Sequence, residues 1–320
     1  METRKRNTWI VVGVVAAVAL LCCCVVALAA AVASWQFGFP RGLSGGPGVD
    51  GGEIDRTYDV GSAPQLTIDS FAGSIVVRAG ESSQIRVMAT PHAPRASDLE
   101  SIEVDIQPRE GGFAVVTRNP GLLTNSWVRL ELVVPAGTSF DVRTSSGGVE
   151  LNGLRGGGKA ETSSGRVTAR NLSGTVSLHT SSGGMSVYSF EGDLKVHVSS
   201  GSIEVDSVEG NLDAHTSSGG IDVRRAQGRV QLETSSGSID YQGAPVGDCS
   251  FKTGSGSIEL QLAPDLDARV DLHTNSGSVR VGFPVEGGGT RQTVTGVIGN
   301  GGDASIYART NSGGINLSQY

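Results

Sequence analysis

The phrase Thr144-Ser-Ser-Gly147 returns throughout the middle of the chain and decides its fold. Successive copies stand 18 residues apart, and a fixed short period indicates one supersecondary unit stacked on itself. The further close copies begin at Thr162, Thr180, Val198, Thr216 and Thr234, and looser copies begin at Thr253, Thr274 and Thr310.

Each period contains two segments in which apolar and polar residues alternate. Ile203 and Val205 follow one glycine, a turn ends at Gly210, and Leu212 and Ala214 alternate after it. Alternation in short segments punctuated by Gly and Ser is typical of strands. Eighteen residues are too few for a crossover helix, so each coil must lie directly on the next, about 4.8 Å away. The sequence therefore predicts an all-β protein, a parallel β-solenoid (β-helix) with coils of 18 residues.

Glycine accounts for 47 of the 320 residues, roughly twice its average usage. Solenoid corners require positive φ, which glycine adopts without a Cβ clash, and the neighbouring Ser and Thr can bond unpaired backbone groups. The predicted structural corners are Gly147, Gly165, Gly183, Gly201, Gly219, Gly237, Gly256, Gly277 and Gly313.

The N-terminal segment predicts a membrane anchor. Residues 1–7 carry three basic side chains, and Thr8–Ala33 contains no charge and is long enough to span a bilayer. The charge distribution predicts a single-pass transmembrane signal-anchor over residues 8–34, with a cytoplasmic N-terminus and an extracytoplasmic rod at the cell membrane. A cleaved signal peptide is the alternative, because Ala31-Val32-Ala33 resembles a small-residue cleavage site.

Three further regions follow the predicted anchor. Residues 35–52 are rich in Gly and Pro and predict a tether. Residues 53–138 predict an irregular β region that caps the solenoid, although Ser70–Val77 looks like a decayed copy of the repeat. Residues 139–320 hold the solenoid repeats. The last coil ends at Leu317, and we expect it to present an unpaired edge that favours weak self-association.

Charge and cysteine content exclude several classes of protein. Without residues 1–7 the chain has 22 basic and 31 acidic residues, a net charge of −9, which argues against nucleic acid and against anionic lipid as partners. Cys22, Cys23 and Cys24 lie in the apolar run, and Cys249 lies at an inward strand position. These four provide neither a disulfide framework nor a zinc spacing, and no cofactor is expected.

Three histidines precede their repeat phrases at the same coil position, namely His179, His197 and His215. On a solenoid they should form a ladder with a spacing of about 4.8 Å, with Glu161 and Glu233 at its two ends. Two imidazoles and an acid are ligands that suit zinc or nickel.

Three features favour a solvated row over a metal site at these histidines. The alternation points them outward, Lys252 and Arg309 fill the same slot in later coils, and a ladder holds its side chains parallel rather than convergent. We therefore expect no bound metal.

Outward acids also stack in successive coils, at Glu204, Asp222, Asp240 and Glu259. A cation would relieve their repulsion, but an exposed charge row is the simpler interpretation. The sequence contains no Ser/His/Asp order, no HExxH and no phosphate loop, so no catalytic residues are assigned and the protein is not expected to be an enzyme.

Three stretches together resemble the bacterial putative-adhesin domain family. They are Val134-Pro-Ala-Gly-Thr-Ser-Phe-Asp-Val-Arg-Thr-Ser-Ser-Gly147, the repeated TSSG with its alternating apolar pair, and Ile298-Gly-Asn-Gly-Gly with Thr310-Asn-Ser-Gly-Gly-Ile-Asn-Leu317. The resemblance covers roughly Thr57 to Leu317. It implies a cell-envelope β-solenoid, often behind one membrane segment, and brings no catalytic motif.

We therefore expect a non-enzymatic adhesion or interaction module of the bacterial cell envelope, with a protein or cell-surface partner. One alternative is envelope-stress sensing, or a regulatory role, through a membrane partner. Another is carbohydrate binding, although the repeats lack outward Trp or Tyr platforms, since Tyr188 and Tyr241 are isolated.

Overall fold

The computed structural model describes residues 48–81 and 83–320, and Val49–Tyr320 form one compact unit. The predicted basic N-terminus (residues 1–7) and signal-anchor (residues 8–34) lie outside the described residues, as does most of the predicted tether (residues 35–52). Within the described ranges, no helix has the length and apolarity needed to cross a membrane.

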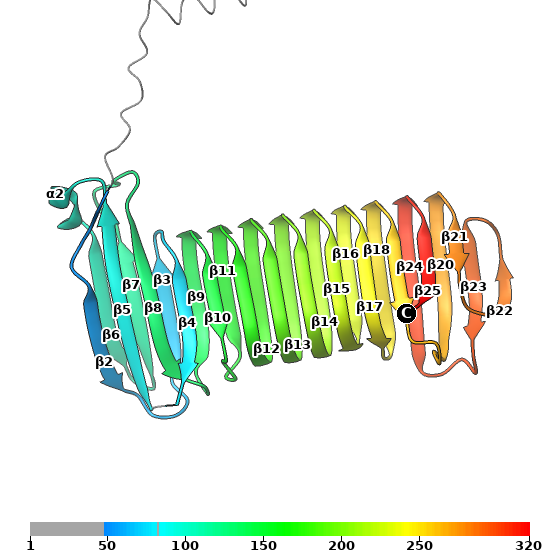
Figure 1. The fold of residues 1–320 in the computed structure, drawn as a ribbon, viewed down its shortest axis with the longest axis horizontal. Helices are drawn as coiled ribbons and strands as arrows, with labels where there is room; N and C mark the ends of the chain where they lie inside the picture. The colour runs from blue at the N-terminus through cyan, green and yellow to red at the C-terminus, as the bar shows by residue number, and fades with distance from the viewer. Residues whose placement is uncertain (1–47, 82) are drawn as a thin grey trace, which may run out of the picture. The chain divides into compact units, whose positions relative to one another are not determined.

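The repeated region forms the parallel coils that its spacing predicts. β12 (Val167–Ser182), β13 (Met185–Ser200) and β14 (Ile203–Ser218) pair in parallel, and each paired residue faces the residue 18 positions further on. The coils lie side by side in Figure 1. The alternation is confirmed as well, because Val205 is fully buried and Glu204 is exposed. The described chain is therefore an all-β, solenoid-like protein.

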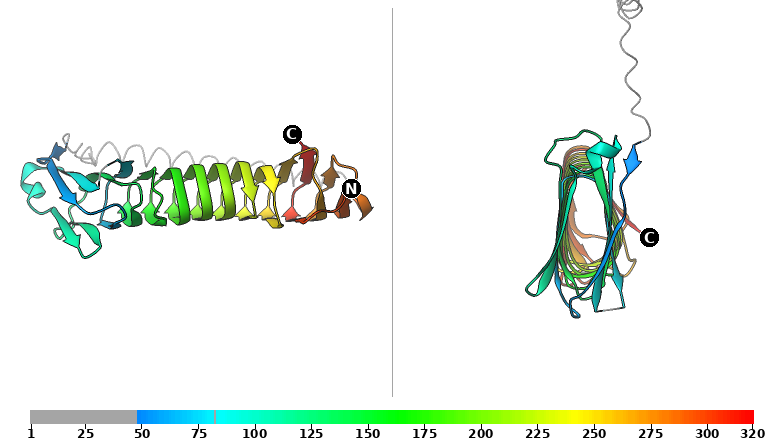
Figure 2. Two further views of the ribbon diagram at one scale, coloured as in Figure 1. Left: turned by 90° about the horizontal axis from the view of Figure 1, so that it is seen from below. Right: turned by 90° about the vertical axis from the view of Figure 1, so that its left-hand side faces the viewer.

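Each coil has two legs, which lie on opposite faces of a flattened outline (Figure 2). In β12, β13 and β14 a single strand runs through both legs. Apolar side chains from both faces form one core between them. The first legs of the other coils are β10 (Val149–Asn152), β15 (Ile221–Gly228), β17 (Ile239–Pro245) and β19 (Ile258–Leu262). The second legs are β9 (Ser139–Ser146), β11 (Gly158–Ser164), β16 (Val230–Ser236) and β18 (Asp248–Ser255).

A ladder of hydrogen bonds holds the serine–glycine corner. The Gly183 N–H donates to the carbonyl of Ser200 (3.0 Å), and the Gly201 N–H donates to the carbonyl of Ser218 (2.8 Å). The buried Thr216 hydroxyl donates to the Gly201 carbonyl (3.0 Å), so it bonds the preceding coil. Gly201 has φ +143°, and a Cβ there would lie 2.1 Å from the carbonyl oxygen of Gly183. Only glycine fits this position.

The other predicted corners mostly share this geometry. Positive φ occurs at Gly147, Gly165, Gly183, Gly201, Gly219, Gly237, Gly256 and Gly313. Gly277 differs, because its φ is not in the positive range. A Cβ on Gly277 would still lie 2.0 Å from the carbonyl oxygen of Gly313, so close contact between coils restricts that corner too.

At the N-terminal end, coil order in space departs from order in the sequence. β3 (Gln65–Ser70) pairs in parallel with β7 (Gly112–Arg118) and with β9, and β4 (Ile75–Gly80) pairs in parallel with β8 (Trp127–Pro135) and with β10. The coil of β3 and β4 thus lies between two later segments. The decayed repeat copy is confirmed, and solenoid pairing begins at Gln65 rather than at the predicted residue 139.

Antiparallel strands continue the two faces beyond this coil. β5 (Gln84–Ala93) pairs with β8 and with β2 (Ile54–Asp59), and β6 (Glu103–Arg109) pairs with β7. The remaining elements at this end are β1 (Val49–Asp50), which pairs with β5, and the short helix α2 (Ala96–Leu99).

At the C-terminal end, too, one coil lies out of sequence order, between two segments that both precede it in the chain. β24 (Ala304–Ser312) pairs in parallel with β18 and with β20 (Ala268–Ser276), and β25 (Ile315–Gln319) pairs in parallel with β19 and with β21 (Val279–Val281). In Figure 1 the red terminal strands accordingly lie between the yellow and the orange strands. The expectation that the coil ending at Leu317 has an unpaired edge is therefore wrong.

The outermost strands at this end form an antiparallel hairpin. β23 (Thr293–Ile298) pairs with β20, and β22 (Glu286–Gly289) pairs with β23. The periodicity of the sequence does not predict that β24 and β25 lie between two earlier coils. The β24–β25 coil follows the β20–β21 coil in the sequence but lies between it and the β18–β19 coil in space. Among the described strands at this end, β22 pairs only with β23 and β21 pairs only with β25, so self-association through an edge here would use one of these strands and not β25.

Candidate functional site

The three predicted histidines form a stacked ladder on the second-leg face. β12, β13 and β14 bring His179, His197 and His215 into register as direct neighbours. Their ring centroids are 5.0 and 5.1 Å apart, and both pairs of ring planes differ by 8°. The buried Leu178, Val196 and Ala214 precede them and point inward, so the imidazoles point to the surface.

The ladder is the centre of a longer row, here called the histidine row. Strand register extends it through charged residues on both sides of the imidazoles. Four of the five histidines of the chain lie in this row, so one face carries most of the imidazole side chains. In spatial order the row contains Asp69, Arg143, Glu161, His179, His197, His215, Glu233, Lys252, Arg309 and His273.

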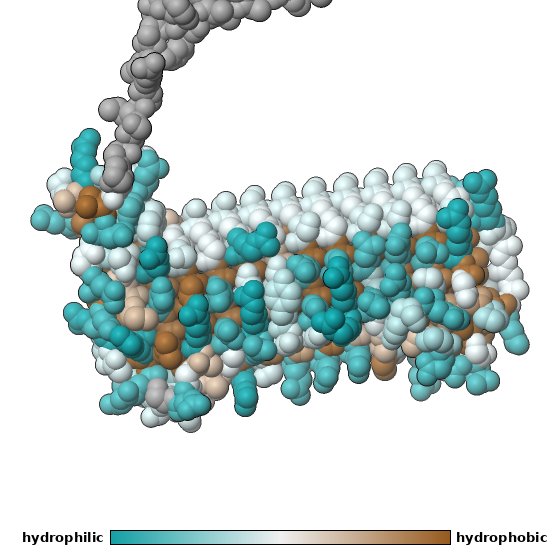
Figure 3. Space-filling view, viewed as in Figure 1, coloured by the Kyte–Doolittle hydropathy of each residue, from teal (hydrophilic) through white to brown (hydrophobic). Residues whose placement is uncertain are grey.

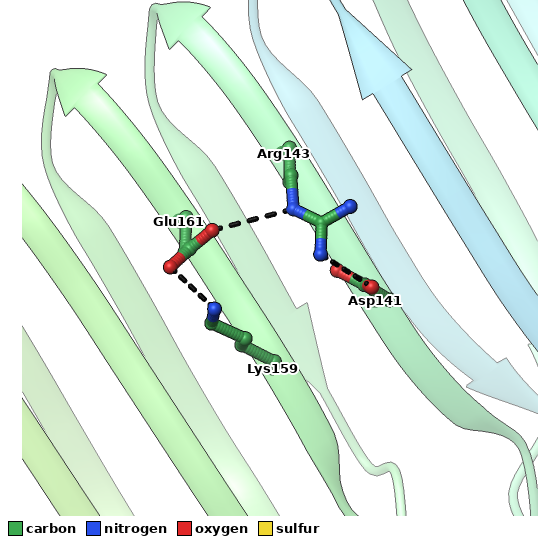
Figure 4. A network of polar contacts seen from close by, with 4 residues as sticks. All are labelled: Asp141, Arg143, Lys159 and Glu161. Atoms are coloured by element: carbon green, nitrogen blue, oxygen red, sulfur yellow. Dashed lines mark hydrogen bonds and ion pairs between the residues drawn. The ribbon is translucent and has the colours of Figure 1, made fainter.

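A network of ion pairs neutralises one end of the ladder (Figure 4). Lys159 Nζ lies 2.6 Å from Glu161 Oε1, and Arg143 Nε donates to Glu161 Oε2 at 3.3 Å. Arg143 Nη2 also donates to Asp141 Oδ2 at 2.8 Å. The hydrogen bond from Lys159, together with Arg143, lowers the pKa of Glu161. Glu161 is therefore already paired and does not compensate charge on His179.

The ladder geometry does not suit a metal ion. The rings stack in parallel, whereas a closed site needs ligands that converge on one point. Among residues 48–81 and 83–320, no group of three or more His, Cys, Asp or Glu side chains is arranged to hold a metal.

Loss of solvation lowers the pKa of His197, and charge on His179 and His215 lowers it further.

A column of serines accompanies the ladder. Ser181, Ser199 and Ser217 come two residues after the three histidines, and the buried residue between each pair places both on the same outward face. His179 and Ser181 line one shallow hollow of about 330 Å³. The sequence analysis did not assign these serines, although the alternation it used was sufficient to find them.

An uncharged row also marks the serine–glycine corner on the surface. In Figure 3 it forms the white band along one long edge, above a face with many polar side chains in teal. The corner combines exposed serine hydroxyls with glycine, so it carries donors without charge.

The predicted acidic row lies on the opposite face. Register places Glu204, Asp222, Asp240 and Glu259 side by side on β14, β15, β17 and β19. Asp222 is paired with Arg224 (Nη2–Oδ2 2.6 Å). Partial loss of solvation raises the pKa of Asp240, and the charges of Glu259 and Asp222 raise it further, against the effect of Arg224. The row is thus only partly compensated by bases.

The corner opposite the serines contains the largest of the open hollows described here. It has a volume of about 750 Å³ and spans five coils. Four residues other than glycine adopt left-handed backbone along it, with φ from +52° to +63°. They are Asn171, Ser189, Ser207 and Arg225. Its walls mix acids such as Glu191 with bases such as Arg155, so no single ligand charge is selected there.

Cys249 is a structural residue. It is buried at 2% exposure in β18, and burial raises the pKa of its thiol. A thiol held protonated is a poor nucleophile and a poor metal ligand. Tyr241 is likewise buried, with its hydroxyl 3.3 Å from the Ala226 carbonyl, so it presents no platform to solvent.

Comparison with known proteins identifies the family. Residues 64–318 match the Toastrack DUF4097 family, so the chain belongs to that family. This confirms the resemblance to a putative-adhesin domain family that the repeat phrases carried. No curated protein matches the chain in sequence.

Three solved structures are similar over most of the described chain. A putative cell adhesion protein from Clostridium sporogenes is 14% identical, with a TM-score of 0.25, and the match covers 84% of this chain and 99% of that one. A putative adhesin from Bacteroides fragilis is 12% identical, with a TM-score of 0.31 and coverage of 83% and 97%. A putative lipid binding protein from Parabacteroides distasonis is 13% identical, with a TM-score of 0.34 and coverage of 83% and 97%. Because these sequence identities are at most 14%, no ligand of these three proteins is assigned to this chain.

Proposed function

We propose that this chain is a non-enzymatic adhesion and interaction module, anchored in the cell membrane by residues 8–34 with its solenoid outside the cytoplasm. The observation that carries the proposal is the arrangement of outward side chains. Strand register from β9 to β20 holds outward polar groups in straight rows on the two opposite outer faces of the solenoid. Such rows suit contacts with an extended partner rather than with a small molecule in a cavity.

Composition supports the same role. The uncharged run Thr8–Ala33 behind three basic residues supports the anchor, and the net charge of −9 beyond residue 7 disfavours nucleic acid. The hollows of the described surface are open and lined by mixed charges. The proposed partner is a protein or another cell-surface component.

Display of the full chain on a non-adherent host cell tests the proposal. We expect attachment to cells or matrix to rise above that of the host, and to fall when the outward pair Glu204→Lys and Asp222→Lys changes one face. Attachment no higher than that of the host cell, together with an envelope-stress phenotype when the gene is deleted, would contradict adhesion and favour sensing through a membrane partner. Mass spectrometry of the mature N-terminus separates a retained anchor from a signal peptide cleaved after Ala33.

A further inference from the structure

The ladder and the serine column together form a strip of hydrogen-bond donors. Each of three successive coils places one imidazole and one hydroxyl on the same face, and strand register sets the spacing of the imidazoles. A protonated imidazole donates from both ring nitrogens, and a serine hydroxyl adds a third donor. The donor strip consists of His179, Ser181, His197, Ser199, His215 and Ser217.

The fixed charges that face the donor strip balance one another. The outward positions nearest to it on β9, β11, β13, β14, β16 and β18 hold four bases and four acids. The face therefore has almost no net charge while the imidazoles are neutral, and it gains up to three positive charges when they are protonated. The eight residues are Asp141, Arg143, Lys159, Glu161, Lys195, Asp213, Glu233 and Lys252.

Protonation of the three imidazoles creates positive charge that the neighbouring side chains do not neutralise. Imidazolium rings about 5 Å apart repel one another, and the register of the coils prevents them from separating. At one end Glu161 is already paired with Lys159 and Arg143. At the other end Glu233 and Asp213 are the acids beside His215, and Asp213 lies directly opposite Lys195 on β13. The fixed charges are thus already balanced before the imidazoles are protonated. An anion laid along the donor strip would relieve this repulsion.

We propose that the donor strip is an acid-gated binding site for a linear polyanion that carries phosphate groups, laid along the stacking direction of the coils. The site depends on the local positive charge of the protonated strip, because the net charge of −9 beyond residue 7 opposes polyanion binding elsewhere on the chain. The donors repeat in one line, so successive groups of a polymer meet successive coils. The free oxygens of a phosphate accept from the imidazolium and from the hydroxyl of one coil. This names a ligand class for the interaction role proposed above and rests on that role.

Linkage gives the site its direction of response. An anion binds more tightly when the imidazoles are protonated, so lower pH tightens binding. The effect falls in the range where histidine titrates. The remaining row histidine, His273, lies beyond Lys252 and Arg309 and contacts Thr293 and Asn275 instead, so it is outside the donor strip.

The test measures binding of inorganic polyphosphate to the full chain in non-ionic detergent. We expect affinity at least about tenfold higher at about pH 5.5 than at about pH 7.5. The triple change His179→Gln, His197→Gln and His215→Gln should abolish this pH dependence, and Ser199→Ala should weaken binding at low pH. His92→Gln is the matched control, because His92 lies on β5 beside Asp50 (2.7 Å) and should leave binding unchanged.

Several outcomes would overturn the proposal. They are equal affinity at both pH values, a triple variant that melts like the parent at about pH 7.5 yet keeps the pH dependence, and equal binding of inorganic phosphate at the same phosphate concentration. Equal capture by phosphatidylglycerol vesicles with the same histidine dependence would assign the surface to a membrane and contradict a polymer ligand. If the triple variant does not fold, the single change His197→Gln must still reduce the pH dependence.

The attachment assay distinguishes failure of this site from failure of adhesion. Cell attachment that persists at neutral pH without polyphosphate binding contradicts only the donor strip. Polyphosphate binding without attachment contradicts only the adhesion role.

Discussion

The strands in the middle of the solenoid and those at its two ends obtain their hydrogen-bonding partners in different ways. From β11 to β18 each coil lies beside the coil that precedes it in the sequence. At the ends the β3–β4 coil and the β24–β25 coil are inserted between segments that are neighbours in sequence but not in space. Repetition supplies a partner only where another copy follows, so an end needs a different source of hydrogen bonds.

The insertion also determines which strand remains at the edge. An exposed parallel edge invites pairing with another chain. Here β25 lies inside the sheet, and the short strands β22 and β21 are outermost at that end. The ends therefore depend on contacts between residues far apart in sequence, which cost more loop-closure entropy than contacts between successive coils.

The largest expected effect comes from removing the inserted coil. Deletion of residues 304–320 takes Ile306, Ile315 and Leu317 out of the core, where each is at most 2% exposed. It also leaves β18 and β20 without their shared partner. We expect a loss of at least about 5 kcal/mol in the free energy of unfolding, measured by chemical denaturation. Deletion of the exposed Tyr320 alone is the control, and equal stability of the two truncated chains would contradict the insertion.

A smaller effect is expected from a charge placed inside a middle coil. Val205→Asp buries an unpaired carboxylate between parallel strands and should cost about 3–5 kcal/mol. The neighbouring Glu204→Lys stays at the surface, where it loses only a hydrogen bond from the Tyr188 hydroxyl, and should change stability by less than about 0.5 kcal/mol. Thermal melting measures both, and an equal drop in Tm would mean that the inward and outward assignment is wrong.

The middle coils could be predicted from the sequence because local periodicity determines them. The 18-residue spacing specifies both the parallel partner and the register, so Val205, the corner glycines and the histidine ladder followed from counting. The ends could not be predicted in this way. Nothing in the alternation of β24 distinguishes pairing beside β20 alone from pairing between β18 and β20.

A corner glycine should matter in the middle and not at the end. Gly201→Ala forces a side chain into a positive φ and against the Gly183 carbonyl, which we expect to cost about 2–3 kcal/mol. Gly288 in β22 has no atom within 4 Å of a built Cβ and no positive φ, so Gly288→Ala should be nearly neutral. The difference in denaturation midpoints measures the contrast. A similar cost at both positions would show that the corner ladder does not select glycine.

The smallest expected effect concerns the acidic row. The folded-state pKa of Asp240 is raised, so its charged form destabilises the fold above that pKa. Asp240→Asn should therefore raise Tm slightly at about pH 7, and this gain should vanish below about pH 4, where the carboxyl is protonated in both states. Asp265→Asn, in the exposed loop after β19, is the control. A gain of the same size at both pH values would contradict the electrostatic explanation.

The candidate site shows the same division between local and distant information. The 18-residue spacing predicted that His179, His197 and His215 lie in one row, and the strand register of β12, β13 and β14 confirms it. The pairing of Glu161 with Lys159 and Arg143 depends on side-chain positions across two strands, which residue spacing does not specify. That pairing decides whether His179 has a counter-ion.

Hydrogen exchange of the full chain tests the central claim about the ends most directly. The account predicts that the amides of β24 are as strongly protected as those of β13, because both strands have a parallel partner on each side. The amides of β22, which pairs only with β23, should exchange fastest among the C-terminal strands. Rapid exchange throughout β24 and β25, as in a frayed final coil, would contradict the account.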